Sequence, residues 1–140
     1  MCVELKQRLF KEIDKLRGSG ANVFCTGMAQ GVDTWCAEIV LELQREYPEV
    51  KLWAVVPCRE QDSMWSSEDK QRYRSILGRC EKVLCVSEEY TKQCMHKRNR
   101  ALVDLCDILV AVYDGKPGGT KYTVDYAKKK NRKTIIVPPM

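Results

Sequence analysis

The 140-residue sequence lacks long apolar segments, and its purely apolar runs, such as Ile108 to Val112, are only a few residues long. A membrane-crossing helix needs about 20 consecutive apolar residues. The N-terminal MCVELKQRLF is amphipathic, unlike the apolar core of a signal peptide. We therefore expect a soluble, non-exported, cytoplasmic protein that has no membrane partner and forms one domain over residues 1–140.

The sequence also lacks a metal-binding pattern. Its only histidine is His96, and its eight cysteines form no C-x-x-C pair. This spacing argues against a zinc site and against a disulfide framework. Most of the cysteines fall in apolar stretches, where a thiol behaves as a small buried hydrophobe. We expect reduced cysteines, no metal and no cofactor.

A large excess of charge is absent as well, because the net charge is only +5. Lysine and arginine gather in HKRNR at 96–100 and KKKNRK at 128–133. The second cluster would end a helix, where cations complement the helix dipole. A solvated helix end is therefore favoured, and nucleic acid is the less favoured partner.

Apolar residues recur at helical spacing between short buried runs, which indicates alternating helices and strands. Helices are expected at 3–17, from 32 to near Pro48, around Tyr73 to Leu77, at 95–104 and up to about Lys130; strands at 22–26, 50–56, 82–86, 107–113 and 134–137. This alternation predicts an α/β fold: a single Rossmann-like domain with a mainly parallel five-stranded sheet and helices on both faces.

Ligands of such sheets bind outside the carboxyl ends of the strands. DGKPGGT, residues 114–120, is the sharper phosphate signal there. Gly118 and Gly119 would let the backbone approach an anion, and Thr120 would cap the helix and offer a hydroxyl. The alternative is an ordinary strand-to-helix loop with a threonine cap.

GMAQGVD, residues 27–33, is less specific by itself. Gly27 and Gly31 allow a tight turn, and Asp33 falls in the first turn of a helix, where the dipole stabilises an acid. The stretch fits neither the dinucleotide fingerprint nor a Walker loop. We expect Asp33 to accept hydrogen bonds from ribose hydroxyls, or else to be a helix-start residue without a ligand.

HKRNR lies at the same expected edge. Arg98 could bind a phosphate through two hydrogen bonds, and Asn99 could contact a base or ribose. The simpler interpretation is that HKRNR is an exposed basic turn. His96 is a candidate general base. Trp65, flanked by polar loop residues, could stack on a purine or belong to the core, whereas Trp53 lies on an apolar pattern typical of the core.

GMAQGVDTWCAEIVLEL, EEYTKQCMHKRNRALVD and DGKPGGTKYTVDYA, in this order, resemble the YpsA-like family of the SLOG superfamily, from about Val3 to Pro138. This superfamily joins the Smf/DprA proteins to the LOG (Lonely Guy) enzymes. The resemblance implies a Rossmann-like fold that binds a nucleotide or nucleotide-derived molecule, in sensing or signalling. The implied ligand-binding residues are Gly27, Met28, Gly31, Asp33, Arg98, Asn99, Asp114, Gly118, Gly119 and Thr120.

The sequence departs from these relatives in two places. YpsA-like proteins usually open with a further strand and a Thr-Gly-His-Arg-like turn, whereas this chain begins at the following helix. LOG enzymes carry P-G-G-x-G-T-x-x-E, and counting from Pro117 places the catalytic glutamate on Asp125, or on Thr123 if a gap retains Thr120. Asp114 and Asp125 are the candidate catalytic acids.

Two alternatives to simple ligand binding therefore stay open. One is a LOG-like nucleoside-monophosphate N-glycosidase (phosphoribohydrolase), so the sequence leaves open whether the protein is an enzyme. The other is DprA-like binding of single-stranded DNA. The oligomeric state, including a homo-oligomer, is open as well.

Overall fold

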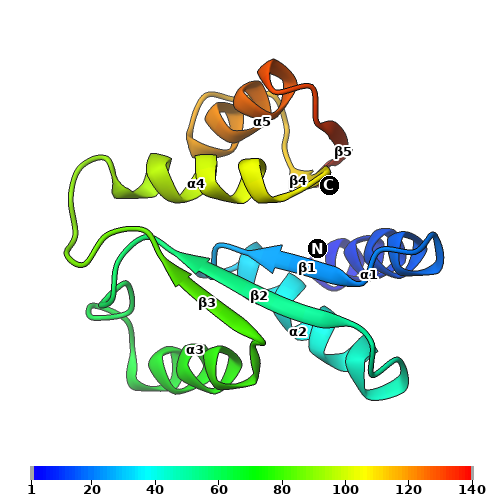
Figure 1. The fold of residues 1–140 in the computed structure, drawn as a ribbon, viewed down its shortest axis with the longest axis horizontal. Helices are drawn as coiled ribbons and strands as arrows, with labels where there is room; N and C mark the ends of the chain where they lie inside the picture. Colours follow the sequence, from blue (N-terminus) through cyan, green and yellow to red (C-terminus); the bar gives the residue numbers. More distant parts are fainter. Residues whose placement is uncertain (1, 140) are drawn as a thin grey trace.

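A computed structural model describes residues 2–139 (Figure 1). In this range helices and strands alternate as expected. The helices are α1 (Cys2–Gly18), α2 (Val32–Glu46), α3 (Ser67–Arg79), α4 (Cys94–Leu105) and α5 (Gly119–Lys129). The strands are β1 (Val23–Thr26), β2 (Lys51–Val56), β3 (Lys82–Cys85), β4 (Ile108–Val112) and β5 (Lys133–Val137). The predicted order of elements is confirmed.

Local chemistry explains where these elements begin and end. Ser66 caps α3, because its Oγ accepts a hydrogen bond from the Asp69 backbone N–H at 3.2 Å. α1 ends at Gly18, and Gly20 then adopts a positive φ of 109°, a conformation that glycine enters without steric cost. These two helix limits therefore have physical causes in the structure.

The strands are parallel but form two sheets, one of order β1-β2-β3 and one of order β4-β5. The parallel α/β fold is confirmed, while the prediction of a single five-stranded sheet is wrong. The physical reason is that, within residues 2–139, β1 pairs only with β2 and β4 pairs only with β5. Figure 1 shows the β4-β5 pair, with α4 and α5, set apart from β1.

One apolar cluster nevertheless connects the two sheets. Leu5, Leu9 and Ile13 on α1 are buried in it, and Val110 of β4 packs against it. Arg8 on α1 also donates from Nη1 to the Pro138 carbonyl oxygen at 2.7 Å, just beyond β5. α1 therefore holds the two sheets in one structure.

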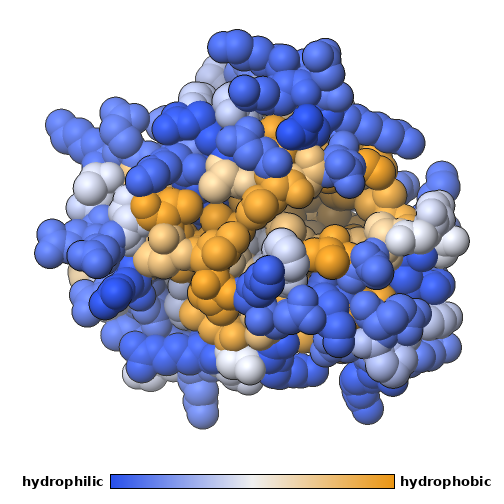
Figure 2. Space-filling model, viewed as in Figure 1, coloured by the Kyte–Doolittle hydropathy of each residue, from blue (hydrophilic) through white to orange (hydrophobic). Residues whose placement is uncertain are grey.

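Helices cover the three-stranded sheet incompletely. All four residues of β3 are exposed, and Val83 and Leu84 retain 45% and 39% of their accessible surface. Trp53 of β2 is half-buried instead of lying in the core: Lys82 Nζ lies 4.5 Å from its ring centre, and its Nε1 donates to Glu81. The expectation that helices cover both faces fails at β3, where Figure 2 shows apolar residues on the surface.

Candidate functional site at the strand ends

The loop that joins β4 to α5 ends in an open helix start. Gly118 is the N-cap of α5 with a φ of 148°, and no side chain caps the helix through a hydrogen bond. Thr120 lies inside the helix, so the expectation that it caps α5 is wrong. Gly118, Gly119 and Thr120 are all exposed. The first N–H groups of α5 therefore face solvent, an arrangement that favours an anion.

Lysines lie beside both candidate acids near this loop. Asp114 accepts a hydrogen bond from the Lys116 backbone N–H at 3.0 Å, and the Lys116 ammonium lies 3.7 Å from its second oxygen. Asp125, on exposed α5 surface, pairs with Lys121 at 2.5 Å. Both carboxylates are exposed. Their role as catalytic acids stays a prediction.

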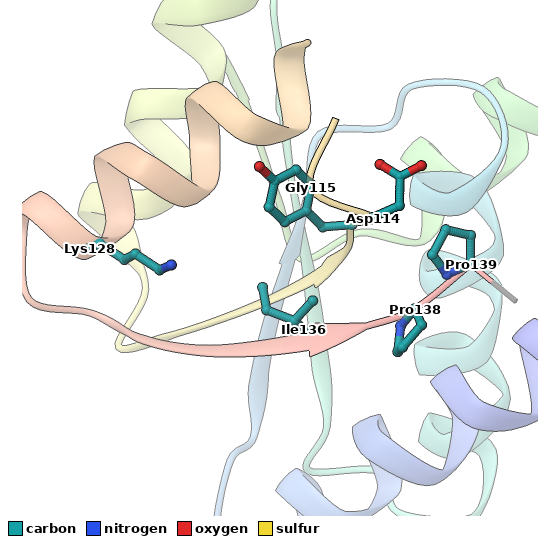
Figure 3. A pocket seen from close by; sticks show the side chains of 7 residues that line it. Asp114, Gly115, Lys128, Ile136, Pro138 and Pro139 are labelled. Atoms are coloured by element: carbon teal, nitrogen blue, oxygen red, sulfur yellow. The ribbon is translucent and has the colours of Figure 1, made fainter. Parts of the chain in front are cut away.

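A cavity of about 720 Å³ begins at Asp114 and extends over the end of β5 (Figure 3). In the figure, Lys128 reaches from α5 toward Ile136 of β5. The lining residues are Tyr113, Asp114, Gly115, Lys128, Ile136, Pro138 and Pro139. The cavity is therefore mostly apolar, with one acid and one base at its rim.

The second motif, GMAQGVD, forms a tight connection between β1 and α2. Met28 is fully buried with a φ of 57°, and Gly31 has a φ of 89° at the N-cap of α2. The Ala29 backbone N–H donates to Asp33 Oδ2 at 3.2 Å. Burial raises the pKa of Asp33, while the nearby Arg98 and the Ala29 hydrogen bond lower it in part. The carboxyl of Asp33 thus stabilises its own loop.

Arg98 is the centre of this second group. Only 6% of it is exposed, and its Nη1 donates to the Gly27 carbonyl oxygen at 2.6 Å. Its Nε donates to Asn99 Oδ1 at 2.7 Å. Burial lowers the pKa of Arg98, and the Asp33 carboxylate opposes that change. Arg98 therefore ties α4 to the loop after β1.

The structure thus places the predicted residues in two groups. Gly27, Asp33, Arg98 and Asn99 lie together around the GMAQGVD loop, and the other group is the loop from Asp114 to Thr120. Within residues 2–139 no hydrogen bond or ion pair recorded for these side chains joins the two groups.

Tyr122, which sequence reasoning missed, joins α5 to α4. Its hydroxyl accepts a hydrogen bond from Arg100 Nη1 at 2.7 Å, and its ring centre lies 4.1 Å from that of His96. The Nδ1 atom of His96 is buried and has no hydrogen-bond partner. The only sequence signal for Tyr122 is that it lies four residues, about one helical turn, after Gly118 at the start of α5.

Trp65 packs edge-on against Tyr73, with ring centres 5.0 Å apart, and adjoins the core cluster. It also lines a small polar cavity of about 140 Å³ at the start of α2, together with Gln30, Gly31, Thr34, Asp69, Arg72 and Tyr73. Trp65 therefore combines both expected positions, since it contacts the core and a cavity wall.

The part of the chain that the structure describes contains no group of three or more His, Cys, Asp or Glu side chains placed to hold a metal ion. Its cysteines from Cys25 to Cys106 are all free thiols. No helix in residues 2–139 is both long and apolar enough to cross a membrane.

This is a Rossmann-like α/β protein, because its parallel strands alternate with helices and a glycine forms the N-cap of the helix after β4. A family model, YpsA, described as the YspA SLOG family, matches residues 2–137. The chain therefore belongs to this SLOG family.

Relatives of the chain include two Bacillus proteins. The uncharacterized SPbeta prophage-derived protein YoqJ of Bacillus subtilis strain 168 is 32% identical over 143 aligned positions, which cover 91% of this chain and 82% of YoqJ. A UPF0398 protein of Bacillus cereus strain G9842 is 33% identical, with 90% of this chain and 70% of that protein covered.

Among solved structures, DNA processing protein A (DprA) from Streptococcus pneumoniae is similar, with a TM-score of 0.64 and 22% identity. The match covers 84% of this chain but 40% of DprA. At this identity the likeness concerns the fold alone.

Proposed function

We propose that this SLOG domain binds a nucleotide or nucleotide-derived small molecule and serves in sensing or signalling. The observation that carries the proposal is the open start of α5, where Gly118 caps the helix without a side-chain hydrogen bond. Exposed backbone N–H groups and the positive end of the helix dipole attract a phosphate there. Lys116 and Lys121 lie beside the same turn, where each ammonium is paired with a carboxylate, Asp114 and Asp125 respectively.

The GMAQGVD loop would form the second wall of the ligand site. In this proposal Gly27, Met28 and Gly31 shape the wall, Asp33 accepts hydrogen bonds from sugar hydroxyls, and Asn99 contacts the base or ribose. Arg98 acts from within the protein, since its side chain is buried and hydrogen-bonded to Gly27. Arg98 would therefore not contact a ligand phosphate directly, and its contribution would be to hold the Gly27 loop in place.

A test combines calorimetry with Gly119→Asp. A side chain at Gly119 meets no atom within 4 Å, so the substitution fits the fold. An acid in the first helical turn stabilises the helix by about 0.3–1 kcal/mol, but it repels a phosphate. The matched control is Ser67→Asp, which adds the same charge to the first turn of α3.

The ligands to test are mono-, di- and cyclic nucleotides and ADP-ribose. We expect at least one to bind and to raise the Tm of the wild type and of Ser67→Asp, while Gly119→Asp folds normally and does not bind it. A flat response across the panel, or equal binding by both variants, would reject the proposed phosphate position.

A nucleotide N-glycosidase is the second candidate, favoured by the position of Asp114 on the wall of the 720 Å³ cavity. Chromatography would detect free base after incubation with nucleoside monophosphates. Release that disappears in Asp114→Asn or Asp125→Asn would support catalysis, whereas equal traces from all three proteins would eliminate it.

DNA binding is the third candidate, favoured by the fold likeness to DprA and by the basic side chains at 128–133. It requires binding of single-stranded DNA that weakens steeply as salt is added. Binding that is absent, or unchanged between low and high salt, would dismiss it.

A further inference from the structure

Three cysteine thiols gather where β2 and β3 end and α4 begins. Cys58 follows the last residue of β2 by two positions, Cys85 is the last residue of β3, and Cys94 is the first residue of α4. In Figure 1 the carboxyl ends of β2 and β3 lie beside the start of α4. These three segments are far apart in the sequence, so only the fold brings the thiols together.

Strand pairing brings Cys85 next to the segment that holds Cys58. Cys85 is the register partner of Val56, the last residue of β2, and the Val86 backbone N–H donates to the Val56 carbonyl oxygen at 3.1 Å. Burial is the main cause of the raised pKa of Tyr73, and the thiols of Cys58 and Cys85 both add to it. Cys58 and Cys85 therefore lie near the same buried hydroxyl.

The packing of α4 places Cys94 against Cys58. α4 packs on β2, and Arg98, one turn after Cys94, bonds to Gly27 just beyond β1, the neighbour of β2. Burial, and then the nearby Cys94 thiol, raise the pKa of Cys58, and the two thiols are hydrogen-bonded to each other. Cys58 is therefore the middle thiol, in contact with Cys94 and close to Cys85.

The three thiols differ in their access to solvent. Cys85 is exposed, and its thiol donates to the Ser87 carbonyl oxygen at 3.0 Å, whereas Cys58 is 3% exposed and Cys94 is fully buried. The raised pKa of Cys58 keeps that thiol protonated at neutral pH, and cysteines react with oxidants as thiolates. An oxidant in solution therefore reaches Cys85 first.

We propose that these three cysteines form an oxidation site, at which a hydroperoxide that reacts with Cys85 produces a disulfide between Cys58 and Cys94. The exposed thiol takes up the oxidant, and the middle thiol passes the oxidation on to its buried neighbour. Because Cys94 is the first residue of α4, the disulfide fixes the start of this helix to the loop after β2.

The first two steps convert the thiols of Cys85 and Cys58 into a disulfide. The Cys85 thiolate attacks one oxygen of hydrogen peroxide, so that an S–O bond forms, the O–O bond breaks, and the departing hydroxide takes up the thiol proton and becomes water. Cys85 is then a sulfenic acid. The Cys58 sulfur attacks the Cys85 sulfur, an S–S bond forms, and hydroxide leaves with the Cys58 proton as a second water.

The third step is a thiol–disulfide exchange. Cys94 attacks the Cys58 sulfur, the Cys58–Cys94 bond forms, the Cys58–Cys85 bond breaks, and the Cys94 proton passes to Cys85. Over the three steps two thiols lose two electrons and two protons, and one hydrogen peroxide is reduced to two waters. Cys85 ends as a free thiol.

The test treats the full chain with hydrogen peroxide, blocks the remaining thiols with iodoacetamide and maps disulfides by mass spectrometry without reduction. We expect a Cys58–Cys94 bond in the wild type that dithiothreitol reverses. Cys85→Ser should slow its formation about tenfold or more, because the thiol in contact with solvent is gone. The matched control is Cys80→Ser, which removes a half-buried thiol at the end of α3 and should leave the rate unchanged.

Two further variants interrupt the relay at different steps. Cys94→Ala should accumulate the Cys58–Cys85 disulfide, and Cys58→Ala should leave Cys85 as a sulfenic acid that dimedone labels. Both replace buried thiols, so circular dichroism first checks that each variant is folded. The wild type and Cys85→Ser test the proposal whatever that check shows.

The proposal is wrong if Cys85→Ser forms the disulfide as fast as the wild type, because oxidation then bypasses Cys85. It is also wrong if the mapped bond in the wild type remains Cys58–Cys85 or joins other cysteines. A Cys85–Cys85 bond between two chains, or Cys85 oxidised to a sulfonic acid with no disulfide formed, would overturn it as well.

Discussion

Replacing Gly27 by alanine should disrupt the contact between α4 and the loop after β1. A Cβ atom at this position would lie 2.7 Å from Arg98 Nη1 and 3.0 Å from Arg98 Cδ. Distances this short force the guanidinium to move. Since only 6% of Arg98 is exposed, it cannot reach water unless α4 also shifts.

The cost follows from the hydrogen bond that is lost. Arg98 Nη1 donates to the Gly27 carbonyl oxygen at 2.6 Å, and a hydrogen bond that involves a charged group contributes about 1.5–3 kcal/mol. We expect Gly27→Ala to lower the free energy of unfolding by about 2 kcal/mol. For a chain of this size that corresponds to a Tm lower by about 8 °C.

Urea denaturation followed by circular dichroism measures this cost in two backgrounds, wild type and Arg98→Met. In the Arg98→Met background, Gly27→Ala should lower the free energy of unfolding by less than about 0.5 kcal/mol. The coupling energy between the two positions is then about 1.5 kcal/mol. Gly78→Ala is the matched control, because a Cβ there meets nothing within 4 Å and alanine favours helix by about 0.5–1 kcal/mol. An equal cost of Gly27→Ala in both backgrounds would refute the reasoning.

Three further predictions follow from single contacts. Ser66→Ala should cost about 1 kcal/mol because it removes the α3 cap, whereas Ser67→Ala should change thermal melts little; equal effects would contradict the capping role. Burial raises the pKa of Asp33, so the unfolded chain loses this proton first once the pH exceeds about 4. Stability should therefore fall from pH 4 toward neutral in the wild type but not in Asp33→Asn, and parallel Tm curves would disprove this. Iodoacetamide at pH 8 should alkylate exposed Cys85 before Cys25, whose pKa is raised to about 11; mass spectrometry that finds Cys25 modified first would reverse the assignment.

Much of the fold could be predicted from local patterns. Leu5, Leu9 and Ile13 recur at helical spacing, and all three are buried on α1. This agreement is physical, because a helix repeats every 3.6 residues and must bury one face. The glycine-rich turns at the strand ends were also evident, because glycine enters positive φ at low cost.

The candidate site could be predicted only in part. The position of Gly118 and Gly119 at the start of α5 follows from local sequence, but the N-cap is Gly118 rather than Thr120. The contact between Arg100 and Tyr122 depends on how α4 packs on α5. No local pattern encodes a distance between two helices.

By itself the sequence determined the order of helices and strands, the parallel α/β class and the resemblance to the SLOG family, because periodicity and motif spacing are properties of neighbouring residues. Only the tertiary structure decided that the strands form two sheets, that β3 is exposed and that Arg98 is buried against Gly27. Strand pairing and burial arise between segments far apart in the chain, and there the basic HKRNR stretch gave no sign that one of its arginines points inward.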